Sequence, residues 1–249
     1  MPGPTAEPPY NPPMPQLVVT GGHRIAGQIS PCGAKNAVLK EMVAMVLASG
    51  THTLRNVPNI IDVQLMCDVL SHLGASCSYD DHVLTVDMPD DLVPEAPLDL
   101  VRAMRASIVV MGPLLARVGR ARVAFPGGDD LGARPIDMHM AGLKAMGAEF
   151  ELEHGVLHAS APAGLTGASI DLEFPSVGAT ENVLFAAVLA RGTTVINNAA
   201  REPEIQDLCA QLTAMGAKIE GEVQLRTKLE SEVPPMLKFK LLSRLRFAP

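Results

Sequence analysis

The sequence contains no tryptophan and few other aromatic residues, with two tyrosines and six phenylalanines among its 249 residues. A folded core must therefore consist of aliphatic side chains and methionine, and a chain of this length that is 47% hydrophobic has enough material for one. The sequence also lacks an apolar run long enough to span a bilayer and a basic segment followed by an apolar one, the mark of a secretory signal. We therefore expect a cytoplasmic protein with no membrane association.

Positive charge is scarce, because 20 lysines and arginines face 27 acidic residues and the net charge is −7. This balance argues against a nucleic-acid partner but leaves room for a local basic pocket. The cysteines form no CxxC pair, and their spacing predicts neither a zinc site nor a disulfide framework; they are Cys32, Cys67, Cys77 and Cys209. Dinucleotide, phosphate-loop, serine-hydrolase and zinc-protease motifs are also absent, so we expect reduced thiols, no metal and no cofactor.

Both ends of the chain differ in composition from the middle. Residues 1–16 contain seven prolines, which predicts a disordered leader, with a proline-rich docking motif as the alternative. Residues 222–249 are basic and have poor helical periodicity. We interpret them as a tail foreign to the preceding domain, with a basic interaction tail as the alternative. The folded domain is therefore predicted over residues 17–221.

Within that domain, one pattern recurs three times, over about residues 30–90, 100–165 and 170–221. In each copy an apolar helix and then a second helix end at a glycine, the residue that favours a left-handed helix stop. These glycines are Gly50 and Gly74, Gly119 and Gly147, and Gly192 and Gly216. A short strand is predicted between each pair, at Thr51–Val57, Arg120–Phe125 and Thr193–Asn197. Helices that alternate with short strands predict an α/β domain.

A hairpin is predicted after the second helix in the first two copies, because residues 80–84 and 153–157 match in register. The third copy loses this pattern near Gly221, where its own hairpin should form. Each complete unit therefore reads helix, strand, helix, strand, strand. A truncated or replaced longer chain would produce the irregular third copy.

The copies also differ in ways that suggest chemistry. The second has four extra residues within Pro126–Pro135, a glycine-rich segment that contains Asp129 and Arg134 and is either a functional loop or a long, flexible turn. If the copies share one orientation, the starts of their first helices lie near one end of the domain, where helix dipoles attract anions. Lys35 and Arg105 near two of these starts would add positive charge. We interpret the combination as a pocket for phosphate and carboxylate groups, although each cation alone is typical of a solvated surface.

Four motifs together make the chain similar to a known family. They are Gly33–Asn36, Met104–Ser107, Pro126–Gly128 with Gly132–Asp137, and Ser176–Thr180. With them the chain resembles the UDP-N-acetylglucosamine 1-carboxyvinyltransferase family from about Leu17 to Gly221. The related shikimate-pathway enolpyruvyl transferases share the fold but fit these motifs less well.

The resemblance implies an inside-out α/β barrel domain made of three βαβαββ-type units. It also implies a transferase that moves the enolpyruvyl group of phosphoenolpyruvate to the 3-hydroxyl of UDP-N-acetylglucosamine. This reaction is the first committed step of peptidoglycan synthesis, with consequences for cell-wall biogenesis, cell shape, cell division and the cell cycle. The partners expected are therefore these two small molecules.

The resemblance assigns residues to phosphoenolpyruvate and to the chemical step. Lys35 and Asn36 would contact phosphoenolpyruvate and the sugar, and Arg105 and Arg134 would hold anionic groups. Asp129 stands where most family members carry a cysteine that is assigned proton transfer to the methylene carbon. A carboxylic acid could replace it if burial raised its pKa, although nearby cations act in the opposite direction. Because fosfomycin alkylates that cysteine, Asp129 predicts fosfomycin resistance.

The resemblance also assigns residues to the nucleotide. The uridine site would be lined by Arg134, Pro135, Ile136, Asp137 and Met138. The diphosphate would accept hydrogen bonds from the backbone of Ser176, Val177 and Gly178.

Family members have two such domains with the site between them, and this chain matches one. We expect the second domain, with an aspartate base and further arginines, to be missing, and the strand at Gln16–Thr20 to have lost its partner. Two alternatives stay open: a catalytically inactive fragment that binds a UDP-sugar, and an enzyme similar to 3-phosphoshikimate 1-carboxyvinyltransferase.

Overall fold

The computed structural model describes residues 18–22, 26–96, 100, 105–124, 136–221 and 238–242. The chain divides into two units, residues 1–31 and 32–249, and every helix and strand described here belongs to the second. The predicted leader, residues 1–16, lies outside the described residues. Of the strand expected at Gln16–Thr20, residues 18–20 are described, and they form no regular structure.

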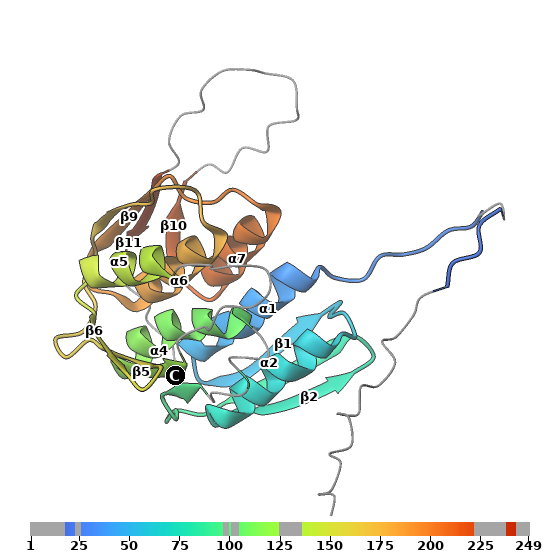
Figure 1. Cartoon of the computed structure of the whole chain (residues 1–249), viewed down its shortest axis with the longest axis horizontal. Helices are drawn as coiled ribbons and strands as arrows, with labels where there is room; N and C mark the ends of the chain where they lie inside the picture. The colour runs from blue at the N-terminus through green and yellow to red at the C-terminus, as the bar shows by residue number, and fades with distance from the viewer. Residues whose placement is uncertain are drawn as a thin grey trace, which may run out of the picture. The chain divides into compact units, whose positions relative to one another are not determined.

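Three successive groups of elements make up the second unit (Figure 1). The first contains α1 (Lys35–Ala44), η1 (Met45–Leu47), β1 (Gly50–Arg55), α2 (Ile61–His72), β2 (Ser76–Asp80) and β3 (Val83–Met88). The second contains β4 (Glu95–Ala96), η2 (Arg105–Val110), α4 (Met111–Val118), β5 (Arg120–Ala124), α5 (Asp137–Ala145), β6 (Glu149–Glu153) and β7 (Val156–Ser160). The third contains β8 (Ser169–Asp171), α6 (Val177–Leu189), β9 (Thr193–Asn197), α7 (Pro203–Ala214), β10 (Lys218–Glu220) and β11 (Lys238–Leu242).

The sheets confirm the threefold repeat. The second and third have the same strand order, β4-β5-β7-β6 and β8-β9-β11-β10, and in each the first strand is parallel to the next while the other pairs are antiparallel. The first sheet, β1-β3-β2, has this order without a leading strand among the described residues. The second and third units are therefore of the predicted βαβαββ type, and the described part of the first begins at its helix.

The two predicted hairpins are also confirmed. The β2–β3 turn places Asp81 and His82 at φ 39° and 61°, and the β6–β7 turn places His154 and Gly155 at φ 49° and 77°. Two successive residues with positive φ are the mark of a type I′ turn, whose twist matches that of the flanking strands. The two hairpin segments therefore match in register along the sequence because both contain the same type of turn.

The third unit differs from the prediction in the segment that we separated as a tail. Lys238–Leu242 forms β11, which lies between β9 and β10 and is antiparallel to both, with Phe239 opposite Ile196 and Leu241 opposite Ile219. This strand occupies the position of the missing hairpin strand and satisfies the backbone groups of two neighbours. Residues 222–237 and 243–249 lie outside the described residues.

The helices lie between the sheets, and their apolar faces form one core (Figure 1). α4 and α5 pack against α6, while α1 packs against α2 and α7. The core consists mainly of Leu, Val, Ile, Met and Ala, with Phe185 as its only buried aromatic residue in the described part of the chain. No helix in that part is both long and apolar enough to cross a membrane. Residues Ala179–Val188 of α6 are all buried, so the polar residues among them need partners.

Candidate functional site

The N-terminus of α6 carries the predicted diphosphate-binding residues Ser176, Val177 and Gly178. Ser176 is the N-cap: its Oγ accepts a hydrogen bond from the amide of Ala179 at 3.3 Å, and its carbonyl accepts one from Thr180 at 3.0 Å. All three predicted residues are half-buried. Because the first amides of a helix have no intrahelical acceptor and the helix dipole is positive there, this end can bind an anion.

His139, in the first turn of α5, packs directly on this helix end. A Cβ atom at Gly178 would lie 3.0 Å from His139 Cε1 and 3.2 Å from Nε2, so the glycine leaves space for the ring. The Nδ1 atom of His139 faces the Asn182 Nδ2 atom at 3.1 Å, and since an amide nitrogen only donates, Nδ1 accepts and the neutral ring carries its proton on Nε2. The residue is 8% exposed, and burial, followed by the charge of Lys40, lowers the pKa of His139 to about 4. His139 is therefore a neutral N–H donor beside Gly178.

His139 is not among the residues predicted from the sequence, because it fits none of the metal or catalytic motifs considered there. The signal was its position, two residues after Asp137 in a motif already assigned to the nucleotide site. Ile136 is the N-cap of α5 and is buried, Asp137 is exposed, and Met138 is half-buried. The contact of His139 with Gly178 brings this group together with the start of α6.

The start of α1 carries Lys35 and Asn36, both exposed. Lys35 Nζ forms an ion pair with Asp62 Oδ1 of α2 at 2.8 Å, and its side chain stays 55% exposed. Just before the helix, the amide of Gly33 donates to the carbonyl of Asn56 at 3.1 Å, and a Cβ atom at position 33 would overlap that carbonyl. The glycine of the first motif therefore allows the close approach that positions the start of α1.

Buried polar contacts join the first helices of the three units. Lys40 Nζ of α1 lies 2.9 Å from Oε1 and 2.8 Å from Oε2 of Glu181 in α6. Asn182, the next residue, donates to the carbonyl of Ile108 in η2 at 3.4 Å, and its Oδ1 accepts from the amide of Gly112 in α4 at 2.7 Å. A helix rises about 1.5 Å per residue, so each of these contacting residues lies within about 9 Å, along the helix axis, of the first residue of its own helix. The starts of α1, η2 and α6 therefore lie near one end of the domain.

The remaining predicted residues are placed only in part. Arg105 is the first residue of η2. Asp129, Arg134 and Pro135 lie outside the described residues. Among the hydrogen bonds and ion pairs of the described residues, none joins Lys35 or Asn36 to the first turn of α6. Of the predicted residues, Gly178 is the one with a described contact to the start of α5, and it makes this contact with His139.

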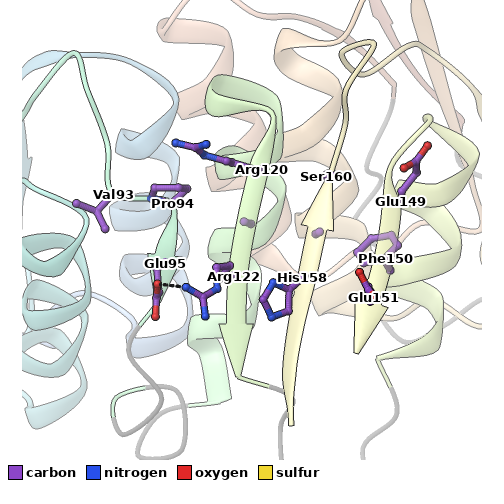
Figure 2. Close-up of a pocket in the computed structure, with 12 residues that line it drawn as sticks. Val93, Pro94, Glu95, Arg120, Arg122, Glu149, Phe150, Glu151, His158 and Ser160 are labelled. Carbon is purple, nitrogen blue, oxygen red and sulfur yellow. Dashed lines mark hydrogen bonds and ion pairs between the residues drawn. The ribbon is translucent and has the colours of Figure 1, made fainter. Parts of the chain in front are cut away.

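A hollow of about 720 Å³ lies elsewhere, on the outer face of the sheet β4-β5-β7-β6 (Figure 2). Its charges alternate across the strands: Glu95 pairs with Arg122 at 2.7 Å, and His158 lies opposite Arg122 and Glu151 in neighbouring strands. It contains none of the predicted site residues, and Arg122 is already paired with Glu95. This face is therefore a poor candidate for an anionic substrate. Among the described residues, no cluster of three or more His, Cys, Asp or Glu side chains could hold a metal ion.

Known proteins are similar to this chain over most of its length. Residues 19–235 match the family described as EPSP synthase (3-phosphoshikimate 1-carboxyvinyltransferase). Proteins named UDP-N-acetylglucosamine 1-carboxyvinyltransferase match from Mycolicibacterium paratuberculosis, at 54% identity over 206 residues, and from Corynebacterium jeikeium, at 55% over 205 residues. These matches cover 83% and 82% of this chain and 49% of each relative. The chain thus spans about half the length of the curated relatives it matches.

Solved structures agree on the fold. The enolpyruvyl transferase NikO from Streptomyces tendae matches with a TM-score of 0.72 at 23% identity, over 89% of this chain and 49% of that one. The EPSP synthase from Acinetobacter baumannii matches with a TM-score of 0.65 at 20% identity, over 87% and 46%. Together with the family match over residues 19–235, these findings show that the chain belongs to the EPSP synthase family and has the enolpyruvyl transferase fold.

Proposed function

We propose that this chain is the nucleotide-binding half of an enolpyruvyl transferase that acts on UDP-N-acetylglucosamine and phosphoenolpyruvate. The support is the family match together with the names of relatives that are more than half identical to it. The chain spans only half the length of those relatives. We therefore expect it to bind the UDP-sugar alone, whereas catalysis needs a second half.

The observation that carries the proposal is the helix end formed by Ser176, Val177 and Gly178 with His139 against it. A diphosphate placed there would accept hydrogen bonds from the amides of Val177 and Gly178 and from the Nε2–H of His139. The amide of Ser176, in contrast, already donates to the carbonyl of Phe174 at 2.7 Å. The neutral ring suits this role, because it donates a hydrogen bond without having to be charged in a buried place. Ile136, Asp137 and Met138 at the neighbouring start of α5 would lie beside the uridine, together with Arg134 and Pro135.

The reaction brings two anionic substrates together, so cations must offset their repulsion. In the proposed reaction the 3-hydroxyl oxygen of the sugar attacks C2 of phosphoenolpyruvate while Asp129 gives a proton to the methylene carbon. A tetrahedral ketal with a new methyl group forms. The methyl group then returns a proton to the Asp129 carboxylate as phosphate leaves, and an enolpyruvyl ether results. Lys35, Asn36, Arg105 and Arg134 would hold the phosphate and carboxylate, and their effect is greatest where water is excluded. The base for the sugar hydroxyl would come from the second half.

Calorimetry with UDP-N-acetylglucosamine tests the binding part of the proposal. We expect measurable binding to the unaltered chain and a loss of at least about tenfold in affinity for Gly178→Ala, because the new Cβ lies within 3.2 Å of the His139 ring. Gly21→Ala is the matched control, since a Cβ there meets open space and the backbone is not in the left-handed region. No binding by the unaltered, folded chain would refute the proposal.

The same titration with 3-phosphoshikimate tests the second candidate, which the description of the matched family favours. Binding of 3-phosphoshikimate in preference to the UDP-sugar would support that candidate. A phosphate-release assay with both proposed substrates then tests catalysis. Binding without phosphate release at high protein concentration would identify the chain as a UDP-sugar-binding fragment.

A further inference from the structure

Two of the four cysteines lie next to each other, although ten positions separate them in the sequence. Cys67 is in α2 and Cys77 is in β2, which packs against that helix. Cys77 Sγ lies 3.9 Å from the carbonyl oxygen of Cys67, and each thiol shifts the pKa of the other. Both side chains are half-buried. The other two cysteines are remote in sequence, with Cys32 exposed and Cys209 in α7.

The pair is reachable from solvent. Both cysteines line a pocket of about 260 Å³ at the first two turns of α2, whose other walls include Ile60, Val63 and Tyr79. This volume is enough for a small organic disulfide to bring its sulfur atoms to the thiols. The proposed substrate residues at the start of α6 do not line the pocket, so the pair is independent of the proposed reaction.

We propose that Cys67 and Cys77 form a reversible dithiol site that reacts with small disulfides and closes to an intramolecular disulfide. The Cys77 thiolate attacks one sulfur of a disulfide RSSR, forming a mixed disulfide and releasing one thiolate RS⁻. The Cys67 thiolate then attacks the Cys77 sulfur, closes the Cys67–Cys77 bond and releases the second RS⁻. In sum, two protein thiols are oxidised, one RSSR is reduced to two RSH, and two protons leave the protein thiols for the released thiolates.

The surroundings assign different roles to the two sulfurs. Hydrogen bonds from Cys67 and Ser71 lower the pKa of Cys77, against the opposing effects of burial and of Asp68. The hydrogen bond to Cys77, followed by burial, raises the pKa of Cys67. Cys77 is therefore the attacking thiol. Once Cys77 is in the mixed disulfide, its negative charge is gone and no longer raises the pKa of Cys67. Cys67 can then lose its proton and act as the resolving thiol.

The chain itself makes this site easy to test. Residues 56–102 contain both cysteines and no lysine or arginine before Arg102, so trypsin releases the pair in one peptide. We expect native, reduced protein treated with oxidised glutathione to give this peptide two hydrogen atoms lighter, resistant to iodoacetamide and restored by reductant. Circular dichroism before digestion would verify that the protein is folded. A peptide that carries two glutathiones, or that stays reduced while Cys32 reacts, would refute the proposal.

Single substitutions test the assigned order. Cys67→Ser should trap one glutathione on Cys77, since no resolving thiol remains. Cys77→Ser should leave Cys67 reacting several-fold more slowly than Cys77 does in Cys67→Ser. Burial and Asp68 still raise the pKa of Cys67 in the first variant, whereas Ser71 still lowers that of Cys77 in the second, and the thiolate is the nucleophile. Cys209→Ser is the matched control and should close the disulfide like the unaltered chain. Equal rates at the two sulfurs, or no trapped adduct in Cys67→Ser, would contradict the order.

Discussion

Lys40 and Glu181 form a charged pair inside the protein. The side chain of Glu181 is fully buried and that of Lys40 is 13% exposed. Burial raises the pKa of Glu181 to about 7, Lys40 opposes this rise, and Glu204 and Glu202 add to it. The folded state therefore holds the proton of Glu181 more tightly than the unfolded state does. Between about pH 4.5 and pH 7 the free energy of unfolding falls as pH rises, by up to about 3 kcal/mol from this group.

Substitution of Lys40 by methionine should therefore have a pH-dependent effect. At pH 8 the charged Glu181 would lose its partner, and we expect the free energy of unfolding to fall by about 3 kcal/mol. At pH 5 Glu181 is protonated, and the loss should be much smaller. Urea unfolding at the two pH values measures both, with Lys218→Met on exposed β10 as a control that changes little at either pH. Equal losses for Lys40→Met at pH 5 and pH 8 would contradict the pKa of Glu181.

Asp129 gives the second prediction for a single residue. A carboxylate is a much weaker nucleophile than a thiolate towards an epoxide, so fosfomycin should leave the unaltered chain unmodified in the presence of UDP-N-acetylglucosamine. Asp129→Cys should gain one covalent adduct at that position. Intact-mass measurement followed by peptide mapping distinguishes this adduct from any on Cys32, which is exposed in both proteins. An adduct on Asp129 itself would contradict the prediction.

At the scale of elements, Asn182 connects three helical segments through one amide group. Its oxygen accepts from Gly112 in α4, and its nitrogen donates to Ile108 in η2 and to His139 in α5. The fit is close, because a Cβ at Gly112 would overlap the carbonyl of Asn182. Because the same amide also contacts His139, the packing of α4 and η2 helps to fix the orientation of the His139 ring beside Gly178.

Asn182→Ala should lower the free energy of unfolding by about 3 kcal/mol, because it leaves the buried amide of Gly112 and the carbonyl of Ile108 without this partner. Chemical denaturation measures the loss. Asn59→Ala, at an exposed asparagine, is the control and should stay within about 0.5 kcal/mol of the unaltered chain. If the two variants were equally stable, the bonds of Asn182 would contribute little.

At the scale of the whole molecule, β11 decides where the domain ends. It pairs with β9 along five residues and with β10 along three. Without it, β9 and β10 would each expose an edge of unpaired backbone groups. Within the segment after residue 221, Lys238–Leu242 is thus part of the third repeat.

Two truncations test this role. A chain that ends at residue 221 should melt several degrees lower than the full chain, and hydrogen exchange should show the amides of Thr193–Asn197 losing protection by at least about tenfold. A chain that ends at residue 242 keeps β11 and should match the full chain. If the chain ending at residue 221 kept full protection in β9, residues 222–249 would be foreign to the domain, as the sequence pattern indicated.

Features set by local chemistry could be predicted from the sequence. The helix stops at Gly119 and Gly147 require a positive φ, and both have one, at 71° and 98°. The hairpin turns follow from the residues that tolerate the left-handed region, such as His154 with Gly155. The failures concern partners distant in the chain. Nothing in the periodicity of residues 238–242 indicates that they pair between β9 and β10, because pairing depends on the strands available in space.

The sequence by itself determined the repeated α/β architecture, the family and the identity of the candidate residues, because turns, helix stops and apolar periodicity depend on near neighbours. Only the tertiary structure decided which of these residues meet. It placed His139 against Gly178, Lys40 beside Glu181, and Cys67 beside Cys77. Each of these contacts joins positions on different elements, and packing rather than spacing along the chain brings them within reach.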